Sequence, residues 1–320
     1  MRNIVLSNNY ELFRYIFADV GDVIFFPYDN YKASRLRDFI LIVAQHIPFI
    51  RITASYHWNR KLIKEWEKGD SINTIIIINT VLANKKMNDK LFSLLKKSNI
   101  HTILFVVDSI NRIPEKHRRC IFKYSKYFDT VYTFDSVDAN RFKWKHNYCY
   151  YSKLQNIMPL GRKTKALCIL YAGDNDRLAK TIALWDKLQS YNLDCFFSIN
   201  GVDKEDLQRY YRPGIIFNHY YSYPDIVGMV LQTEIIIEII REGQNGNTLR
   251  TFEAVVYNRK LLTNWSGINT FPYYDSRFMK VFGSVDSLDK IEDDFWKSNS
   301  SLDYQYNGDF SPRYLIDKEN

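Results

Sequence analysis

Short apolar runs alternate with segments of helical spacing along the whole chain, and this alternation limits the possible folds more than any other feature. In the first half, apolar runs lie at residues 74–79 and 101–107. Segments with helical spacing lie at residues 31–45, 84–97 and 115–128. Apolar strands that alternate with helices form parallel sheets with helical crossovers, so the sequence predicts an α/β fold.

A second alternation of the same kind fills the other half and includes an apolar strand at residues 235–240. Between the halves, residues 148–165 combine weak periodicity with a proline, a glycine and clustered positive charge, which is typical of a domain linker. A chain of 320 residues suits two domains of about 150 residues each. We therefore predict a pair of doubly wound Rossmann-like domains facing across a cleft, at residues 1–150 and 151–320, with a C-terminal helix in the second.

Composition restricts the class of protein. The hydrophobic fraction of 46% provides enough apolar surface for two cores, and the net charge of +8 favours phosphate-rich partners such as nucleotide diphosphates, anionic lipid or nucleic acid. The four cysteines form no CxxC pair or Cys/His cluster, so neither a zinc site nor a disulfide scaffold is expected. No apolar run approaches the roughly 20 residues that cross a bilayer. These features predict a soluble cytoplasmic protein.

The stretch REGQNGN, residues 241–247, follows the strand at residues 235–240 and should enter the crevice at the carboxyl edge of the sheet. Gly243 and Gly246 would let the backbone approach a ligand closely. A helix should then begin near Asn247 or Thr248, both good N-cap residues, with its first N–H groups directed at the crevice. Such a helix terminus is a site for a diphosphate.

Two charged residues follow within this helix. Glu253 could accept hydrogen bonds from two vicinal hydroxyls, and Arg250 could lie near the phosphates. Alternatively, Glu253 is a surface carboxylate that pairs with Arg250 at i,i+3, and Gln244 and Asn247 are ordinary loop residues. The residues alone leave both interpretations open.

This arrangement resembles the donor site of GT-B glycosyltransferases, whose second domain carries two carboxylates eight positions apart around a glycine-rich loop. The resemblance implies that the loop and helix terminus hold the diphosphate of a nucleotide sugar and that the second carboxylate, Glu253, binds the ribose. Eight positions before it stands Asn245, followed by the expected glycine, Gly246. The departure from an acid would shift the sugar contacts to Asn245 and Gln244.

The form Q-x-G-x-T-x-R-x-x-E-A followed by KLLTN looks closer to bacterial enzymes that build lipopolysaccharide cores, O-antigens and capsules. Residues 130–144 and 170–188 also look like that branch. The resemblance implies that Gly173 and Arg177 contact the donor phosphates, although Arg177 could also be a solvated helix residue. It further implies an acceptor-side first domain, a donor-binding second domain and no cofactor, because the nucleotide sugar is the substrate.

An inverting transferase needs a base at the carboxyl edge of the first domain. Asp108 follows the apolar run at residues 101–107 directly, and Asp29 and His57 also stand at strand ends. The alternatives are helix caps for the two aspartates and a packed histidine. No DxD motif lies in a loop setting, so we expect metal independence, with Arg177, Arg250 and the helix terminus supplying positive charge. Whether the enzyme inverts or retains stays open.

Three rival interpretations remain. A non-catalytic or regulatory nucleotide-binding protein would keep Glu253 and lack a base. A nucleic-acid-binding protein would suit the charge, but no recognised motif is present and acidic residues interleave with the basic ones. A dehydrogenase lacks its glycine fingerprint. The expectation is a GT-B glycosyltransferase of bacterial surface-polysaccharide assembly, acting on a glycan or lipid-linked acceptor at the inner face of the plasma membrane, where basic and aromatic residues of its first domain contact anionic lipid.

Overall fold

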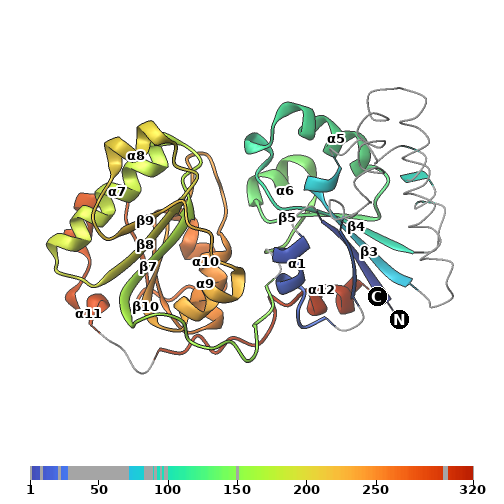
Figure 1. Cartoon of the computed structure of the whole chain (residues 1–320). Coiled ribbons are helices and arrows are strands. Elements are labelled where there is room, and N and C mark those ends of the chain that lie inside the picture. The colour runs from blue at the N-terminus through green and yellow to red at the C-terminus, as the bar shows by residue number, and fades with distance from the viewer. Residues whose placement is uncertain are drawn as a thin grey trace, which may run out of the picture. The chain divides into compact units, whose positions relative to one another are not determined.

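The structure of the protein is a computed structural model, which describes residues 2–7, 10–20, 23–27, 72–82, 89, 92–93, 96, 100–148, 151–297 and 302–319. The chain divides into two compact units. Unit 1 comprises residues 1–150 and 311–320, and unit 2 comprises Tyr151–Phe310. Within the described residues, each unit contains one six-stranded parallel sheet with helices packed against it (Figure 1).

The sheet of unit 1 has the strand order β2-β1-β3-β4-β5-β6. Its strands are β1 (Arg2–Ser7), β2 (Val23–Pro27), β3 (Ile72–Ile78), β4 (His101–Val106), β5 (Thr130–Thr133) and β6 (Lys145–His146). The described helices are α1 (Tyr10–Ile16), α5 (Glu115–Ser125), α6 (Ser136–Phe142) and α12 (Pro312–Glu319). Residues 75–78 of β3 and 103–106 of β4 are apolar and buried, as expected for strands that are covered on both faces of a parallel sheet.

The sheet of unit 2 has the order β12-β11-β10-β7-β8-β9. Its strands are β7 (Thr164–Tyr171), β8 (Cys195–Asn200), β9 (Ile215–Phe217), β10 (Thr233–Glu238), β11 (Lys260–Thr263) and β12 (Met279–Val281). Its helices are α7 (Asn175–Ser190), α8 (Lys204–Tyr210), α9 (Tyr223–Val230), α10 (Leu249–Val256) and α11 (Asp293–Trp296). The chain adds β8 and β9 on one side of β7 and then crosses to β10 on the other side. The carboxyl ends of β7 and β10 therefore flank the point where strand order reverses, which is where such sheets bind ligands.

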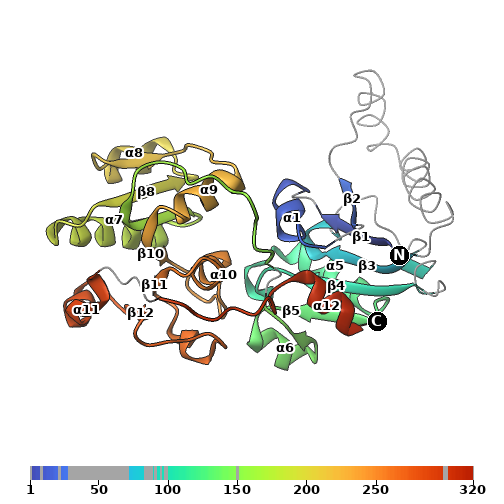
Figure 2. The ribbon, with the colours of Figure 1, turned by 90° about the horizontal axis from the view of Figure 1, so that it is seen from below.

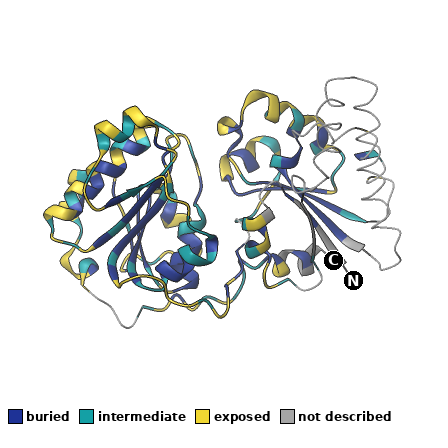
Figure 3. Cartoon of the chain, viewed as in Figure 1, coloured by how far each residue is buried: buried dark blue, intermediate teal, exposed yellow. Residues whose placement is uncertain are grey.

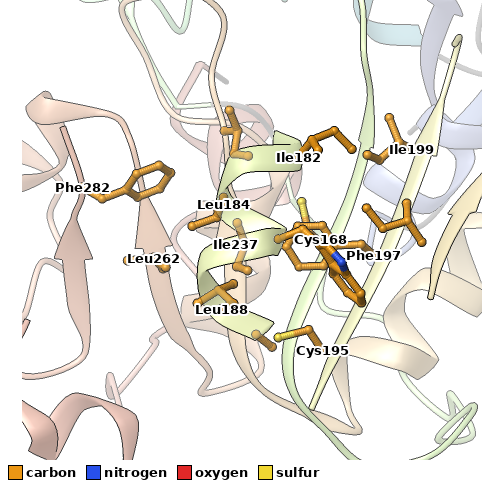
Figure 4. Close-up of a cluster of buried hydrophobic side chains, with 14 of the residues drawn as sticks. Cys168, Ile182, Leu184, Leu188, Cys195, Phe197, Ile199, Ile237, Leu262 and Phe282 are labelled. Carbon is orange, nitrogen blue, oxygen red and sulfur yellow. The ribbon is translucent and has the colours of Figure 1, made fainter. Parts of the chain in front are cut away.

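The longest helix of unit 2, α7, closes one face of this sheet. Figure 4 shows Ile182 and Leu188 of α7 within a cluster that also contains Phe197 of β8 and Ile237 of β10. Trp185 meets Phe197 edge to face, with ring centroids 5.0 Å apart. Because this cluster is fully buried, it holds α7 and the loop before it in a fixed position relative to β7.

In both units most described residues of the central strands are buried, and many exposed residues lie on the outer faces of the helices (Figure 3). Helix α10 differs, because most of its residues are buried beside β10 and β11 (Figure 2). Phe252, Ala254 and Val255 are 0% exposed, and so is the acidic Glu253. A carboxylate in such a position needs internal partners.

The fold confirms the predicted pair of Rossmann-like α/β domains. The predicted helix at residues 31–45 lies outside the described residues, as do most of residues 84–97. The final helix, α12, belongs to unit 1 and not to the second domain, where the sequence analysis put it. No helix in the described part of the chain is both long enough and apolar enough to cross a membrane.

The predicted linker at residues 148–165 is wrong for most of its length. Tyr151 is 1% exposed and stacks on Phe252, with ring centroids 6.0 Å apart. The amide of Leu154 donates to the hydroxyl of Tyr257, and the amide of Leu160 donates to the carbonyl of Gly228. The segment up to β7 thus belongs to unit 2 and is joined to it by these contacts, with Tyr151, Ser152 and Leu154 buried and most of residues 155–163 exposed. Its proline and glycine resemble a linker only in composition.

Candidate functional site

The loop after β7 is shaped by a glycine and an aspartate. Gly173 adopts φ = 74°, a left-handed conformation that favours glycine. Asp174 is the N-cap of α7 and accepts a hydrogen bond from the amide of Arg177 at 2.8 Å. The guanidinium of Arg177 then turns back and donates through Nη1 to the carbonyl of Tyr171 at 2.8 Å. Arg177 is therefore held at the carboxyl end of β7 and is not a freely solvated helix residue; its contact with donor phosphates stays a prediction.

A second arginine reaches the same place from the loop after β10. The guanidinium of Arg241 lies directly against Gly173, because a Cβ added at Gly173 would come within 1.8 Å of its Nη2 atom. Asn264 fixes the backbone just before Arg241. It accepts a hydrogen bond from the amide of Ile240 at 2.6 Å and donates one to the carbonyl of Ile240 at 3.1 Å. Glycine at position 173 thus makes room for a side chain from another loop.

Sequence reasoning missed Arg241. Arg241 directly follows an apolar strand that ends at the crevice, and this position is the signal that could have identified it. The glycines and the helix terminus that follow it are the stronger local pattern. The contact with Gly173 depends on the pairing of β7 with β10, which the local sequence does not display.

The two arginines form a like-charged pair. Burial lowers the pKa of Arg177, and the neighbouring positive charge of Arg241 also lowers it. The Nε atoms of both guanidinium groups are buried and lack a hydrogen-bond partner within the described residues. Two cations with unused donors, drawn together by the fold, form a site that an anion would complete.

Asn247 adds a third unused donor in the loop that leads into α10. Its side chain is 2% exposed, and its Nδ2 atom has no hydrogen-bond partner in the described part of the chain. Buried amide donors are normally satisfied, so this one is also suited to a bound acceptor. Gly243 of the same loop has φ = 74°, Gly246 is buried, and Gln244 donates to the carbonyl of Gly246 at 3.4 Å.

The start of α10 is occupied by the protein's own carboxylate. Glu238, the last residue of β10, is 1% exposed and accepts hydrogen bonds from the amide of Thr248 at 2.9 Å and its hydroxyl at 2.7 Å. The hydroxyls of Thr251 and Thr263 donate to Glu238 as well, at 2.8 and 2.7 Å. Thr248 is the N-cap of α10, and its hydroxyl accepts from the amide of Arg250.

The first N–H groups of this helix are expected to be directed at a ligand, but some of the amides at its start have acceptors inside the protein. The amides of Thr248 and Arg250 are satisfied inside the protein. The predicted strand runs to residue 240 because Ile239 and Ile240 are apolar, which places Glu238 inside the strand and not at its end. In the structure β10 ends at Glu238. The unused donors lie instead on Arg177, Arg241 and Asn247.

Glu253 has two partners of its own. Its Oε1 accepts from the hydroxyl of Tyr223 at 3.2 Å, and its Oε2 forms an ion pair with Arg250. Burial raises the pKa of Glu253, and the charge of Arg250 opposes that rise. The pairing with Arg250 is one of the two alternatives, but Glu253 is fully buried and Arg250 is half-buried, so the pair does not lie on an exposed helix surface. For Glu253 to bind a ribose directly, the ribose hydroxyls would have to replace Tyr223 or Arg250 as its hydrogen-bond donors.

In unit 1, Asp108 lies two residues beyond the end of β4 and is exposed. It is not the N-cap of the short 3-10 helix at Ile110–Arg112, because that position is Ser109. Asp29 and His57 lie outside the described residues.

The other two carboxylates of this edge, Asp135 and Asp138, have structural partners. Asp135 caps α6 and accepts from the hydroxyl of Ser109 at 2.5 Å. Asp138 accepts from the amide of Ile110 at 2.7 Å, and burial raises its pKa. Among the described residues, no group of three or more His, Cys, Asp and Glu side chains is arranged to hold a metal ion.

Comparison with known proteins identifies the fold and goes no further. No protein-family model matches the chain, and no curated protein matches it. Among solved structures, a UDP-GlcNAc 2-epimerase from Methanocaldococcus jannaschii in complex with UDP-GlcNAc and UDP is 12% identical, with a TM-score of 0.50 over 100% of both chains. A trehalose-6-phosphate protein from E. coli bound with UDP-2-fluoro glucose is 9% identical, with a TM-score of 0.53 over 100% of this chain and 96% of that one.

A Glycosylation Associate Protein (Gap123) complex from Streptococcus agalactiae also matches, at 14% identity and a TM-score of 0.45. The match covers 82% of this chain and 54% of that one, so this chain spans about half the length of that protein. The likeness to the epimerase and to the trehalose-6-phosphate protein confirms the GT-B-like fold of two Rossmann-like domains.

The hydrogen bonds of Glu238 lead to a prediction about stability. We expect Glu238→Ala to lower the free energy of unfolding of unit 2 by about 3 kcal/mol, because it leaves three threonine hydroxyls and one amide without their acceptor. Urea unfolding monitored by tryptophan fluorescence measures the change. Glu242→Ala, which removes an exposed carboxylate from the adjoining loop, is the control and should leave the midpoint unmoved. Equal midpoints for the two variants would contradict this role of Glu238.

Proposed function

We propose that the protein is a glycosyltransferase that takes a sugar from a nucleotide-sugar donor bound at the carboxyl edge of unit 2. The observation that carries the proposal is the like-charged pair of Arg177 and Arg241, which converge beside Gly173 with unused donors. Repulsion between two neighbouring cations destabilises the protein without a ligand, and a bound anion offsets that repulsion.

The form of the site favours a diphosphate over a single carboxylate or phosphate. Two guanidinium groups and the buried amide of Asn247 present donors from two different loops. A diphosphate carries two linked phosphates with several acceptor oxygens, and it can therefore engage both loops together. In nucleotide sugars the diphosphate is also the leaving group, so the same cations would stabilise the charge that develops during transfer.

These cations support the proposal that no metal ion is needed. Arg177 and Arg241 would supply the charge stabilisation that a divalent cation provides in metal-dependent transferases. Arg250 belongs to the same region of unit 2 as Arg177. Burial raises the pKa of Cys168, and the charges of both arginines act on this thiol by lowering its pKa. We propose that Glu253 acts as a positioning residue that holds Arg250 in place. Contact with the ribose then follows only if the nucleotide displaces Arg250.

The acceptor side of the proposal rests on unit 1. We propose that Asp108, exposed beyond the end of β4, is the base that removes the proton from the acceptor hydroxyl. Asp29 and His57 are the other candidates. Residues 241–265 resemble enzymes of bacterial lipopolysaccharide and capsule assembly, which supports a glycan or lipid-linked acceptor.

An aromatic cluster on unit 1 supports peripheral contact with anionic lipid at the inner face of the membrane. Phe142 lies between Phe122 and Trp144, with ring centroids 5.0 and 4.9 Å away, and Phe122 is 43% exposed. The guanidinium of Arg141 lies over the ring of Phe142 at 5.2 Å. Further exposed cations adjoin these rings in the sequence: Arg119, Lys123, Lys143 and Lys145. Aromatic rings surrounded by basic residues are typical of surfaces that bind anionic membranes.

Donor binding can be measured by thermal shift with UDP-, GDP-, CMP- and dTDP-sugars. At about one hundred times its Kd, the true donor should stabilise the folded protein by about 2.7 kcal/mol and raise the Tm. Arg241→Met should abolish that rise, whereas Arg209→Met, at an exposed arginine of α8, should retain it. Absence of any shift across the whole panel would remove the basis of the proposal. If the protein distinguishes UDP from 2′-deoxy-UDP and Glu253→Gln does not, Glu253 contacts the ribose directly.

The role of the base can be tested by kinetics once a donor is known. We expect Asp108→Asn to lower kcat by about a hundredfold or more while the Kd of the donor stays unchanged, because the carboxylate acts on the acceptor. Nucleotide release in the presence of a glycan acceptor gives kcat, and titration of the donor without acceptor gives its Kd. Full activity of Asp108→Asn would exclude this residue as the base. Donor binding without any transfer in the wild-type protein would favour the non-catalytic alternative.

Membrane contact can be measured by co-sedimentation with vesicles that contain anionic phosphatidylglycerol. The wild-type protein should sediment with them at low salt, and the double variant Lys143→Glu/Lys145→Glu should lose this association because each basic residue near the surface contributes about 1 kcal/mol. Lys204→Glu/Arg209→Glu changes the net charge equally on α8 of unit 2 and should still sediment. Equal loss in both double variants would show a response to net charge alone.

A further inference from the structure

Tyr171, the last residue of β7, presents an aromatic ring to solvent beside the arginine pair. Its side chain is 60% exposed, although it stands at the end of a strand whose other residues are largely buried. The strand is central in the sheet, with β8 on one side and β10 on the other. The ring therefore lies at the crevice where ligands bind in sheets of this type.

The ring rests on the backbone of the neighbouring loop. A Cβ added at Gly201, directly after β8, would lie 2.3 Å from the Cζ atom of Tyr171 and 2.4 Å from its Cε2 atom. Gly201 also has φ = 73°, so the loop adopts there a conformation that favours glycine. One part of the ring is thus supported by backbone, and the exposed part stays open to solvent. This contact fixes a flat surface without covering it.

The same residue is joined to the anion site through its backbone. The carbonyl of Tyr171 accepts the hydrogen bond from Nη1 of Arg177 at 2.8 Å. The guanidinium of Arg241 lies against Gly173, two residues after Tyr171. A diphosphate held by Arg177 and Arg241 would therefore have the Tyr171 ring next to it, on the side of β8.

We propose that Tyr171 is the stacking platform for the nucleobase of the donor, an inference that rests on the proposed function. The base is the flat aromatic part of a nucleoside diphosphate, and stacking on a tyrosine ring needs no hydrogen-bond partner on the protein. Stacking of this kind tolerates any base, because every base has a π face. Tyr171 thus contributes affinity for the nucleoside, whereas the arginines contribute affinity for the diphosphate.

The test is isothermal titration of the full-length protein with UDP, ADP, GDP, CDP and dTDP, and with inorganic pyrophosphate as the probe that lacks a base. For the nucleoside diphosphate that binds wild type most tightly, Tyr171→Ala should raise the Kd at least about fivefold. The affinity for pyrophosphate should not change. Tyr171→Phe, which keeps the ring, should bind like wild type.

Two further variants make the result specific. Gly201→Ala keeps Tyr171 in the sequence, but the added Cβ displaces its ring. It should therefore weaken binding of the nucleoside diphosphate and leave binding of pyrophosphate unchanged. Tyr211→Ala removes another tyrosine that is 60% exposed, at the C-cap of α8, and should have no effect. Unchanged nucleoside-diphosphate affinity in Tyr171→Ala would overturn the inference while leaving the proposed function intact. The same result is expected if the Tyr171 ring contacts the donor sugar and not the base, because these probes carry no donor sugar. If wild type bound none of these nucleotides, the proposed function and the inference would both fall.

Discussion

The carboxylate of Glu238 decides which charges at the carboxyl edge of unit 2 remain available to a ligand. It is buried, and its acceptors are taken by Thr248, Thr251 and Thr263. In this way it joins β10 to α10 and β11, and it occupies the helix terminus that would otherwise attract an anion. Burial and the charge of Arg241 lower the pKa of Arg177 and the negative charge of Glu238 raises it, but Glu238 forms no ion pair with Arg177 or Arg241 within the described residues.

A second buried carboxylate works in the same way on the other side of α10. Glu253 is committed to Arg250 and Tyr223, so Arg250 is neutralised internally while Arg177 and Arg241 are not. Of these three arginines, Arg250 is paired with a carboxylate, whereas the buried Nε donors of Arg177 and Arg241 have no partner among the described residues. We propose that a nucleoside diphosphate supplies that partner and that the exposed ring of Tyr171 extends the same site toward the base. Donor recognition would then lie within unit 2 alone.

The sequence predicted the architecture well because buried parallel strands are continuous apolar runs whose ends are marked by polar residues. Through resemblance it pointed to Gly173 and Arg177, which lie together in the loop after β7, and their contact with a donor stays a prediction. It misjudged the end of β10, because Glu238 interrupts an apolar run and a charge in that position is ordinarily exposed. It also missed Arg241, whose role depends on a contact with Gly173 that exists only when β7 and β10 pair. The membership of residues 151–163 in unit 2 and that of α12 in unit 1 are likewise long-range properties that local composition does not encode.

The most direct measurement is a crystal structure of the protein with bound UDP or whichever nucleoside diphosphate it prefers. The account predicts phosphate oxygens within hydrogen-bond distance of Nε of Arg177, Nε of Arg241 and Nδ2 of Asn247, with Glu238 still bonded to its threonines. A diphosphate seated on the first amides of α10 with Glu238 displaced, or one bound away from both arginines, would contradict it.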